Sequence, residues 1–135
     1  MSSAEFGGLL ALFFGAPLVV LACRCQQPTP PPCEAYKSVD LVVTGRVTAV
    51  RPDPATNSVT ATVTVLKSWK KRAPAEITVV TGDTCAYQFV VGREDLLYLF
   101  AGESGGYTTN RCFGNRAAKS AAKAIQWLNR CGKAF

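Results

Sequence analysis

The sequence contains no histidine among its 135 residues, and only 18% of its residues are charged. Without histidine the chain cannot form a Ser-His or Cys-His catalytic pair. It also cannot form a zinc-protease H-E-x-x-H helix or a histidine-based metal cage. None of its six cysteines forms the C-x-x-C pair that zinc knuckles require. We therefore expect a protein that is not an enzyme and that holds no cofactor of its own.

The chain also lacks an uninterrupted apolar run of about 20 residues, the length that spans a bilayer. Its longest apolar stretch, residues 9–22 (LLALFFGAPLVVLA), contains one Gly and one Pro. This stretch fits the apolar core of a secretory signal that is cleaved before Cys23. We predict that residues 1–22 are a signal peptide and that the mature protein is secreted or periplasmic. The alternative is an uncleaved N-terminal anchor or a buried helix, because residues 1–8 contain no Lys or Arg.

Residues 23–135 are predicted to form a single domain. The only charged residue before them is Glu5, so they hold all 15 basic residues and eight of the nine acidic ones. This length supports one modest core and not two. All six cysteines lie in this region, and an even number in an exported chain predicts three disulfides in one of 15 pairings. The alternative for Cys23 is acylation, as in a lipoprotein, which would leave an odd number of thiols.

Cys23 and Cys25 stand two residues apart in a segment that is expected to be extended. Side chains at positions i and i+2 of an extended segment run parallel, so a disulfide between these two cysteines would be strained. We expect each of them to bond a distant cysteine, and this reasoning leaves the partners open. The first and third residues of the mature chain would then be fixed to the domain.

Alternation of apolar and polar residues predicts a mainly β fold with about five short strands. Strand-like segments are expected at 41–51, 59–65, 77–81, 89–91, 96–101 and 107–112, with Gly45 a bulge or close-packing point. A change to helical spacing then predicts a C-terminal helix between an N-cap at Asn115 and a C-cap at Gly132. Short strands avoid open edges by curling, so we predict a five-stranded OB-like closed barrel packed by that helix.

Cleavage before Cys23 would give its α-amine a chemical role. The amine has an unperturbed pKa of roughly 7.7–8.0, so near neutral pH a fraction of it is neutral and able to bind a metal. The amine nitrogen and the carbonyl oxygen of Cys23 could form a five-membered chelate. A catalytic zinc keeps positions open for water and substrate, and a chelate that displaces this water would inhibit the enzyme.

The cysteine spacing and three short stretches resemble the tissue inhibitors of metalloproteinases and the wider netrin-like family. The cysteines are Cys23, Cys25, Cys33, Cys85, Cys112 and Cys131. The stretches are 40–47 (DLVVTGRV), 66–70 (LKSWK) and 85–89 (CAYQF). The resemblance covers nearly all of residues 23–131 and implies a netrin-like domain with an OB-type barrel. It also implies the disulfides Cys23–Cys85, Cys25–Cys112 and Cys33–Cys131.

In the inhibitors, the first cysteine caps the zinc of the target enzyme and the second residue enters the adjacent specificity pocket. The resemblance implies that Cys23 binds the zinc of a partner zinc metalloprotease and that Arg24 enters the pocket. The implied inhibitory ridge consists of Cys23, Arg24, Cys25, Gln26, Asp83 and Thr84. Arg24 departs from the small Thr or Ser of the inhibitors, and burial of an unpaired guanidinium is costly.

The second hypothesis is a netrin-like binding module that inhibits nothing. Its support is a basic cluster around an aromatic residue, made of Lys67, Trp69, Lys70, Lys71 and Arg72. Such a patch could bind an anionic glycan or a lipid surface, whereas we expect no nucleic acid in an exported compartment. The basic stripe of the C-terminal helix is expected to be a solvated face. A monomer is expected, anchored to a membrane only if Cys23 is acylated.

Overall fold

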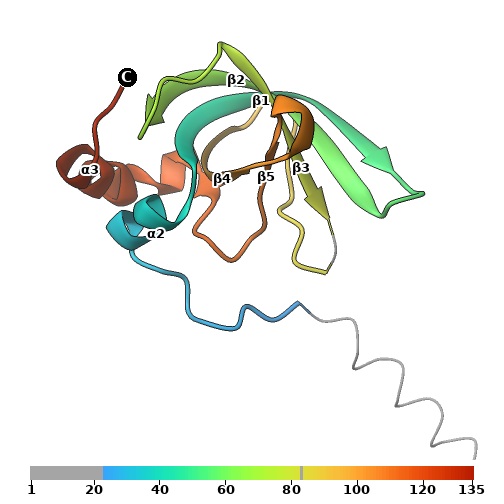
Figure 1. The fold of residues 1–135 in the computed structure, drawn as a ribbon, viewed down its shortest axis with the longest axis horizontal. Coiled ribbons are helices and arrows are strands. Elements are labelled where there is room, and N and C mark those ends of the chain that lie inside the picture. The colour runs from blue at the N-terminus through green and yellow to red at the C-terminus, as the bar shows by residue number, and fades with distance from the viewer. Residues whose placement is uncertain (1–22, 83) are drawn as a thin grey trace, which may run out of the picture.

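The computed structural model describes residues 23–82 and 84–135 (Figure 1). The predicted signal peptide at residues 1–22 and the candidate ridge residue Asp83 lie outside the described residues. The described part is mainly β, with a C-terminal helix and three disulfides. These three features confirm the corresponding predictions from the sequence.

Three antiparallel strands form the first half of the sheet, and they are β1 (Leu41–Asp53), β2 (Ser58–Trp69) and β3 (Glu76–Gly82). Their β-branched residues suit a pleated surface that is buried on one face. The pairing of β1 with β2 shifts register at Gly45, where a Cβ atom would collide with the side chain of Val63. The close-packing point predicted at Gly45 is therefore confirmed.

The fourth and fifth strands bring the sheet back onto itself. β4 (Glu94–Ala101) pairs antiparallel with β1, and β5 (Tyr107–Thr108) pairs with β4 and runs parallel to β3. A short sixth strand, β6 (Arg116–Ala117), pairs with the start of β4. The result is a six-stranded mixed sheet in which five strands make a near-closed ring, in the order β1-β2-β3-β5-β4-β1. Figure 1 shows these strands curling around one another.

The ring buries apolar side chains on both of its faces. The interior cluster contains Leu41, Val43, Val47, Ala61, Val63, Ile77, Val79, Phe89, Leu97, Leu99 and Tyr107. The outer cluster contains Ala35, Val39, Val42, Trp69, Leu96, Tyr98, Ala121, Ala124 and Leu128. β1 and β4 contribute to both clusters because successive side chains of a strand point to opposite faces. The helices therefore pack on the outside of the ring, against β1 and β4.

Two helices cover this outer face. They are α2 (Pro32–Ser38) and α3 (Ala122–Cys131), and the disulfide between Cys33 and Cys131 joins them. Proline at the first position of α2 suits a helix start, since its missing N–H would have no partner there. At the end of α3, the N–H of Gly132 donates to the carbonyl oxygen of Leu128, so the C-cap predicted at Gly132 is confirmed.

Three predicted element boundaries are wrong. Residues 89–91 form no strand: Phe89 is buried in the interior cluster, but the chain turns at Gly92, whose φ is 90°. The strand predicted over 107–112 ends at Thr108, and the side chain of Asn110 accepts the N–H of Cys112 in a local turn. The helix begins at Ala122 rather than after Asn115, because β6 and a single 3₁₀ turn come first.

Candidate functional site

Two disulfides fix the N-terminal segment of the domain to two loops. Cys23 is bonded to Cys85 and Cys25 to Cys112, with Cα–Cα distances of 5.0 and 5.5 Å. These two pairs, and the third between Cys33 and Cys131, are the pairs that the family resemblance implies. The local reasoning that Cys23 and Cys25 would not bond each other is also confirmed. Both ends of the C-x-C motif are thereby covalently anchored.

The first two disulfides lie against each other. The sulfur atoms of Cys23, Cys25 and Cys112 all lie within 4.8 Å of one another. Cysteine binds metals as a thiolate, and all three sulfurs are oxidised in disulfides. This cluster is therefore a covalent junction between the N-terminal segment and the two loops, and not a metal site of this chain.

Arg111 connects the two anchoring loops to each other. Its backbone N–H donates to the carbonyl oxygen of Cys85 at 3.0 Å, and its guanidinium Nη2 donates to the carbonyl oxygen of Thr84 at 3.1 Å. Thr84 is exposed beside the Cys23–Cys85 disulfide, so the structure places it next to the start of the domain. The neighbouring Cys25 is fixed to the second loop through Cys112.

A buried carboxylate supports the loop that carries Cys85. Asp95 on β4 is fully buried, and the guanidinium of Arg93 donates to its two oxygens at 2.6 and 3.0 Å. The hydroxyl of Tyr87 donates to the same carboxylate at 3.0 Å, and Arg93 also donates to the carbonyl oxygen of Gln88. Burial, followed by the charge of Asp95, raises the pKa of Tyr87 well above its ordinary value. The Tyr87–Gln88 segment is thus held to β4 by charged hydrogen bonds.

Asn115 gives comparable support to the loop that carries Cys112. Its side-chain oxygen accepts the backbone N–H of Tyr98 on β4 at 2.7 Å. Its amide nitrogen donates to Thr109 Oγ1 at 2.7 Å and to the carbonyl oxygen of Asn110 at 3.1 Å. Asn115 therefore links the loop that carries Cys112 to β4 through hydrogen bonds. Because its side chain is used in this way, it does not serve as the predicted N-cap.

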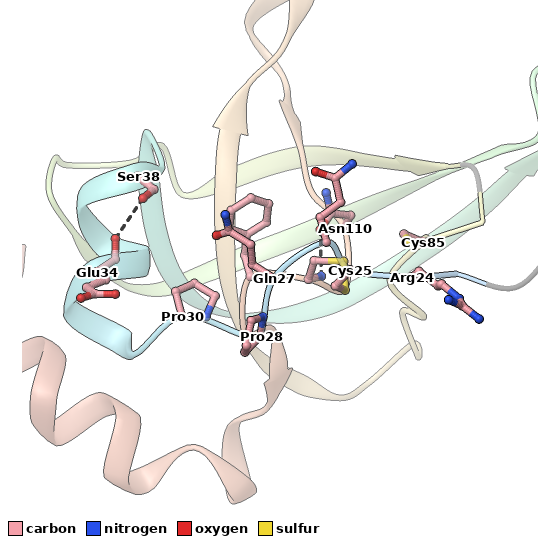
Figure 2. Close-up of a pocket in the computed structure, with 12 residues that line it drawn as sticks. Arg24, Cys25, Gln27, Pro28, Pro30, Glu34, Ser38, Cys85 and Asn110 are labelled. Atoms are coloured by element: carbon pink, nitrogen blue, oxygen red, sulfur yellow. Dashed lines mark hydrogen bonds between the residues drawn. A yellow bond between two sulfur atoms is a disulfide. The ribbon is translucent and has the colours of Figure 1, made fainter.

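The two remaining ridge candidates within the described residues, Arg24 and Gln26, are both exposed. Figure 2 shows the side chain of Arg24 extending away from the disulfides, while the chain after Cys25 continues toward α2. A groove of about 510 Å³ runs along this segment, and Pro28, Glu34 and Phe113 contribute to its walls. Arg24 is thus an exposed residue between two cysteines that are both anchored by disulfides.

The basic cluster predicted around Trp69 is not an exposed patch with an aromatic centre. Trp69 is fully buried in the outer cluster, and its indole N–H donates to the side chain of Asn129. The ammonium of Lys70 donates to main-chain carbonyls at the end of α2. Lys71 and Arg72 are exposed, over the rings of Tyr107 and Phe135. Burial of the indole removes the surface on which a ligand would stack.

Sequence reasoning missed the residues that support the site from behind. Glu94 and Asp95 are adjacent in the sequence but lie in different environments: Glu94 is half-exposed and pairs with Arg46, whereas Asp95 is fully buried. Sequence reasoning did not identify Asp95 as the partner of Arg93 and Tyr87. The sequence did contain a signal for this role. Asp95 directly precedes the apolar run 96–100, which is typical of a strand that is buried on both faces, and an ionisable residue at such a position needs a partner.

The three disulfides indicate an oxidising, extracellular type of compartment. Within residues 23–82 and 84–135, neither helix has the length and apolar character needed to cross a membrane. In comparisons with known proteins, no protein-family model matches the chain, and no curated protein matches it.

Proposed function

We propose that the mature protein is a secreted inhibitor of zinc metalloproteases. Its N-terminal Cys23, freed by removal of residues 1–22, chelates the zinc of the partner enzyme through its α-amine and its carbonyl oxygen. Arg24 enters the pocket beside the zinc, and the ridge continues through Cys25 and Gln26, with Asp83 and Thr84 alongside. The zinc belongs to the partner enzyme.

The observation that carries this proposal is the pair of adjacent disulfides at Cys23 and Cys25. Terminal residues normally fray, and a frayed terminus loses entropy when it binds. Here positions 23 and 25 are each bonded to a loop, and both loops are tied to β4 through Asp95 and Asn115. A chelating group held in this way is already ordered before the enzyme is met.

The arrangement of the strands supports the assignment to a netrin-like domain with an OB-type closed barrel. A five-stranded ring in the order β1-β2-β3-β5-β4-β1, with one parallel contact between β3 and β5, agrees with that fold. The three disulfide pairs agree with those that the resemblance implies. Both observations favour the netrin-like family. The proposed ridge residues are those that stand at the positions of the inhibitory ridge in that family.

The test begins with the mass of the exported, unreduced protein. We expect the mass of residues 23–135 less six hydrogens, because a free Cys23 amine and three disulfides are both required. The same preparation is then assayed against a panel of zinc metalloproteases with a fluorogenic peptide. Inhibition that rises with protein concentration and is competitive with the peptide supports the proposal.

The matched control carries one additional alanine before Cys23. The nitrogen of Cys23 then becomes an amide, so Cys23 can no longer form the five-membered chelate, and the free amine belongs to an alanine that no disulfide holds. The three disulfides and the domain are expected to be unaffected. This variant should keep its folded circular dichroism spectrum and lose inhibition. Equal inhibition by the extended variant would rule out chelation, and a retained leader or an acylated Cys23 would leave the alternative of an anchored, non-inhibitory binding module.

A further inference from the structure

The last 32 residues of the chain have a one-sided charge. Residues 104–135 contain no Asp or Glu. They contain six basic residues, which are Arg111, Arg116, Lys119, Lys123, Arg130 and Lys133. Within residues 23–82 and 84–135, the ion pairs join Arg46 to Glu94 and Arg93 to Asp95, so no ion pair neutralises the basic residues of α3. This part of the chain therefore carries an uncompensated positive charge.

An exposed indole lies among these charges. Lys123, Trp127 and Arg130 follow one another at helical spacings of four and three, so they share one face of α3. The side chain of Trp127 is 48% exposed, and the guanidinium of Arg130 lies 5.4 Å from the centre of its ring. The opposite face of α3, with Ala124 and Leu128, is buried against the sheet. Trp127 thus belongs to neither of the two buried clusters.

The C-terminal tail continues this surface. Ala134 forms a β-bridge with Trp69 at the end of β2, and Phe135 is 44% exposed, with Lys133 and Arg72 close to its ring. Figure 1 shows the C-terminal end beside α3, on the side of the molecule opposite to the hairpin between β1 and β2. Exposed aromatic side chains therefore occur at two positions of residues 104–135, a segment that contains no Asp or Glu.

We infer that the exposed face of α3, with Lys123, Trp127 and Arg130, is a docking site for an anionic lipid surface. Lys and Arg attract acidic headgroups, and a tryptophan side chain is suited to the boundary between headgroups and acyl chains. A sulfated polysaccharide would need the cations alone, and so the exposed indole favours the membrane. The protein lies on the surface through this face, which leaves the ridge at Cys23 free. The inference does not depend on inhibition.

The two tryptophans make a direct test possible. Trp69 is fully buried and Trp127 is half-exposed, so a change in emission on binding reports Trp127. The mature protein is mixed with vesicles of phosphatidylcholine, with or without phosphatidylglycerol, and both sedimentation and emission are recorded. We expect binding to the vesicles that contain phosphatidylglycerol, a blue shift of the emission, and loss of both at high salt.

Charge reversal at two positions of α3 should distinguish binding through this face from a general attraction between a basic protein and an acidic membrane. Lys123→Glu and Arg130→Glu should each lower the vesicle affinity by on the order of tenfold, and Trp127→Ala should lower it with the net charge unchanged. The matched control is Arg51→Glu, at the distant end of β1, which changes the net charge equally. An equal loss in the control would overturn the inference. So would binding to heparin without binding to vesicles, because the occupant would then be a glycan.

Discussion

The ammonium Nζ of Lys70 lies 3.0 Å from the carbonyl oxygen of Tyr36, at the carboxyl end of α2. The same ammonium donates to the carbonyl oxygens of Lys37 at 3.3 Å and of Val39 at 2.5 Å. The last carbonyls of a helix have no intrahelical partner, and a cation is favourable there. Lys70 therefore fixes α2, which carries Cys33, to the end of β2, and is not a free member of a ligand-binding patch.

Lys70→Met should destabilise the domain because these carbonyls lose their partner. We expect the free energy of unfolding to fall by about 1–2 kcal/mol, the range for hydrogen bonds from a charged group at a helix end. Urea titration followed by circular dichroism measures this change. Lys71→Met, at the exposed neighbouring position, is the control and should change stability by less than about 0.5 kcal/mol. Equal effects at both positions would show that the cap contributes nothing.

Amidation of two adjacent carboxylates should reduce stability by very different amounts. Asp95 is fully buried, and Asp95→Asn removes the charged partner of the Arg93 guanidinium. We expect the free energy of unfolding to fall by about 3 kcal/mol. Glu94→Gln breaks an ion pair of two well-exposed side chains and should cost less than about 1 kcal/mol. Denaturant unfolding of the two variants under identical conditions compares them. A cost for Asp95→Asn as small as that for Glu94→Gln would contradict the supporting role of Asp95.

Stability should decrease at alkaline pH through Tyr87. Burial and the charge of Asp95 raise the pKa of Tyr87 in the folded state, while in the unfolded chain a tyrosine ionises near its ordinary pKa of about 10. Ionisation above that pH therefore favours the unfolded state, so this contribution is complete below about pH 10 and is lost as the pH rises further. Burial raises the pKa of Tyr98 too, and its effect has the same sign.

Comparison of Tyr87→Phe with the unsubstituted protein tests this linkage. At pH 8 the variant should be less stable by about 1 kcal/mol, because Asp95 loses one hydrogen bond. Between pH 8 and pH 10.5 its urea midpoint should decrease less than that of the unsubstituted protein. Parallel decreases in the two proteins would mean that Tyr87 does not cause the alkaline loss.

Arg24→Thr should strengthen inhibition of enzymes with apolar pockets, since the proposed ridge would no longer bury an unpaired guanidinium. We expect the inhibition constant to fall by about tenfold or more. Arg24→Lys keeps the charge and is the matched control, with little expected change. Arg24 is exposed, and so neither change should alter the unfolding midpoint. Weaker inhibition by Arg24→Thr would indicate an acidic group in the pocket of the partner.

Removal of different disulfides should separate stability from inhibition. Cys33 and Cys131 are 98 residues apart, and replacement of both by alanine should cost about 4–5 kcal/mol in the chain-entropy model. This variant should still inhibit at temperatures where it is folded. Replacement of Cys25 and Cys112 by alanine removes an anchor of the ridge and should abolish inhibition even in the folded state. Full inhibition by that second variant would argue against a rigid ridge.

Much of the fold followed from local patterns in the sequence. The alternation over 59–65 predicted β2, and the change to helical spacing predicted a C-terminal helix, which is α3. The C-x-C motif indicated two distant disulfide partners, because neighbouring side chains in an extended segment cannot bond without strain. These features depend on residues close together in the chain, and so the sequence determined them by itself.

The tertiary structure decided what depends on residues far apart in the chain. In the folded protein, Asn115 accepts the backbone N–H of Tyr98 and does not cap a helix, because this buried N–H on β4 needs an acceptor. The tertiary structure also buried Trp69 and placed Lys70 under the end of α2, which left Trp127 as the exposed indole. A side chain's apolar or basic character is local, but its exposure depends on which elements pack against it. Only the packed ring and its helices distinguish a cation that caps a helix, such as Lys70, from cations whose side chains extend into solvent, such as Lys123.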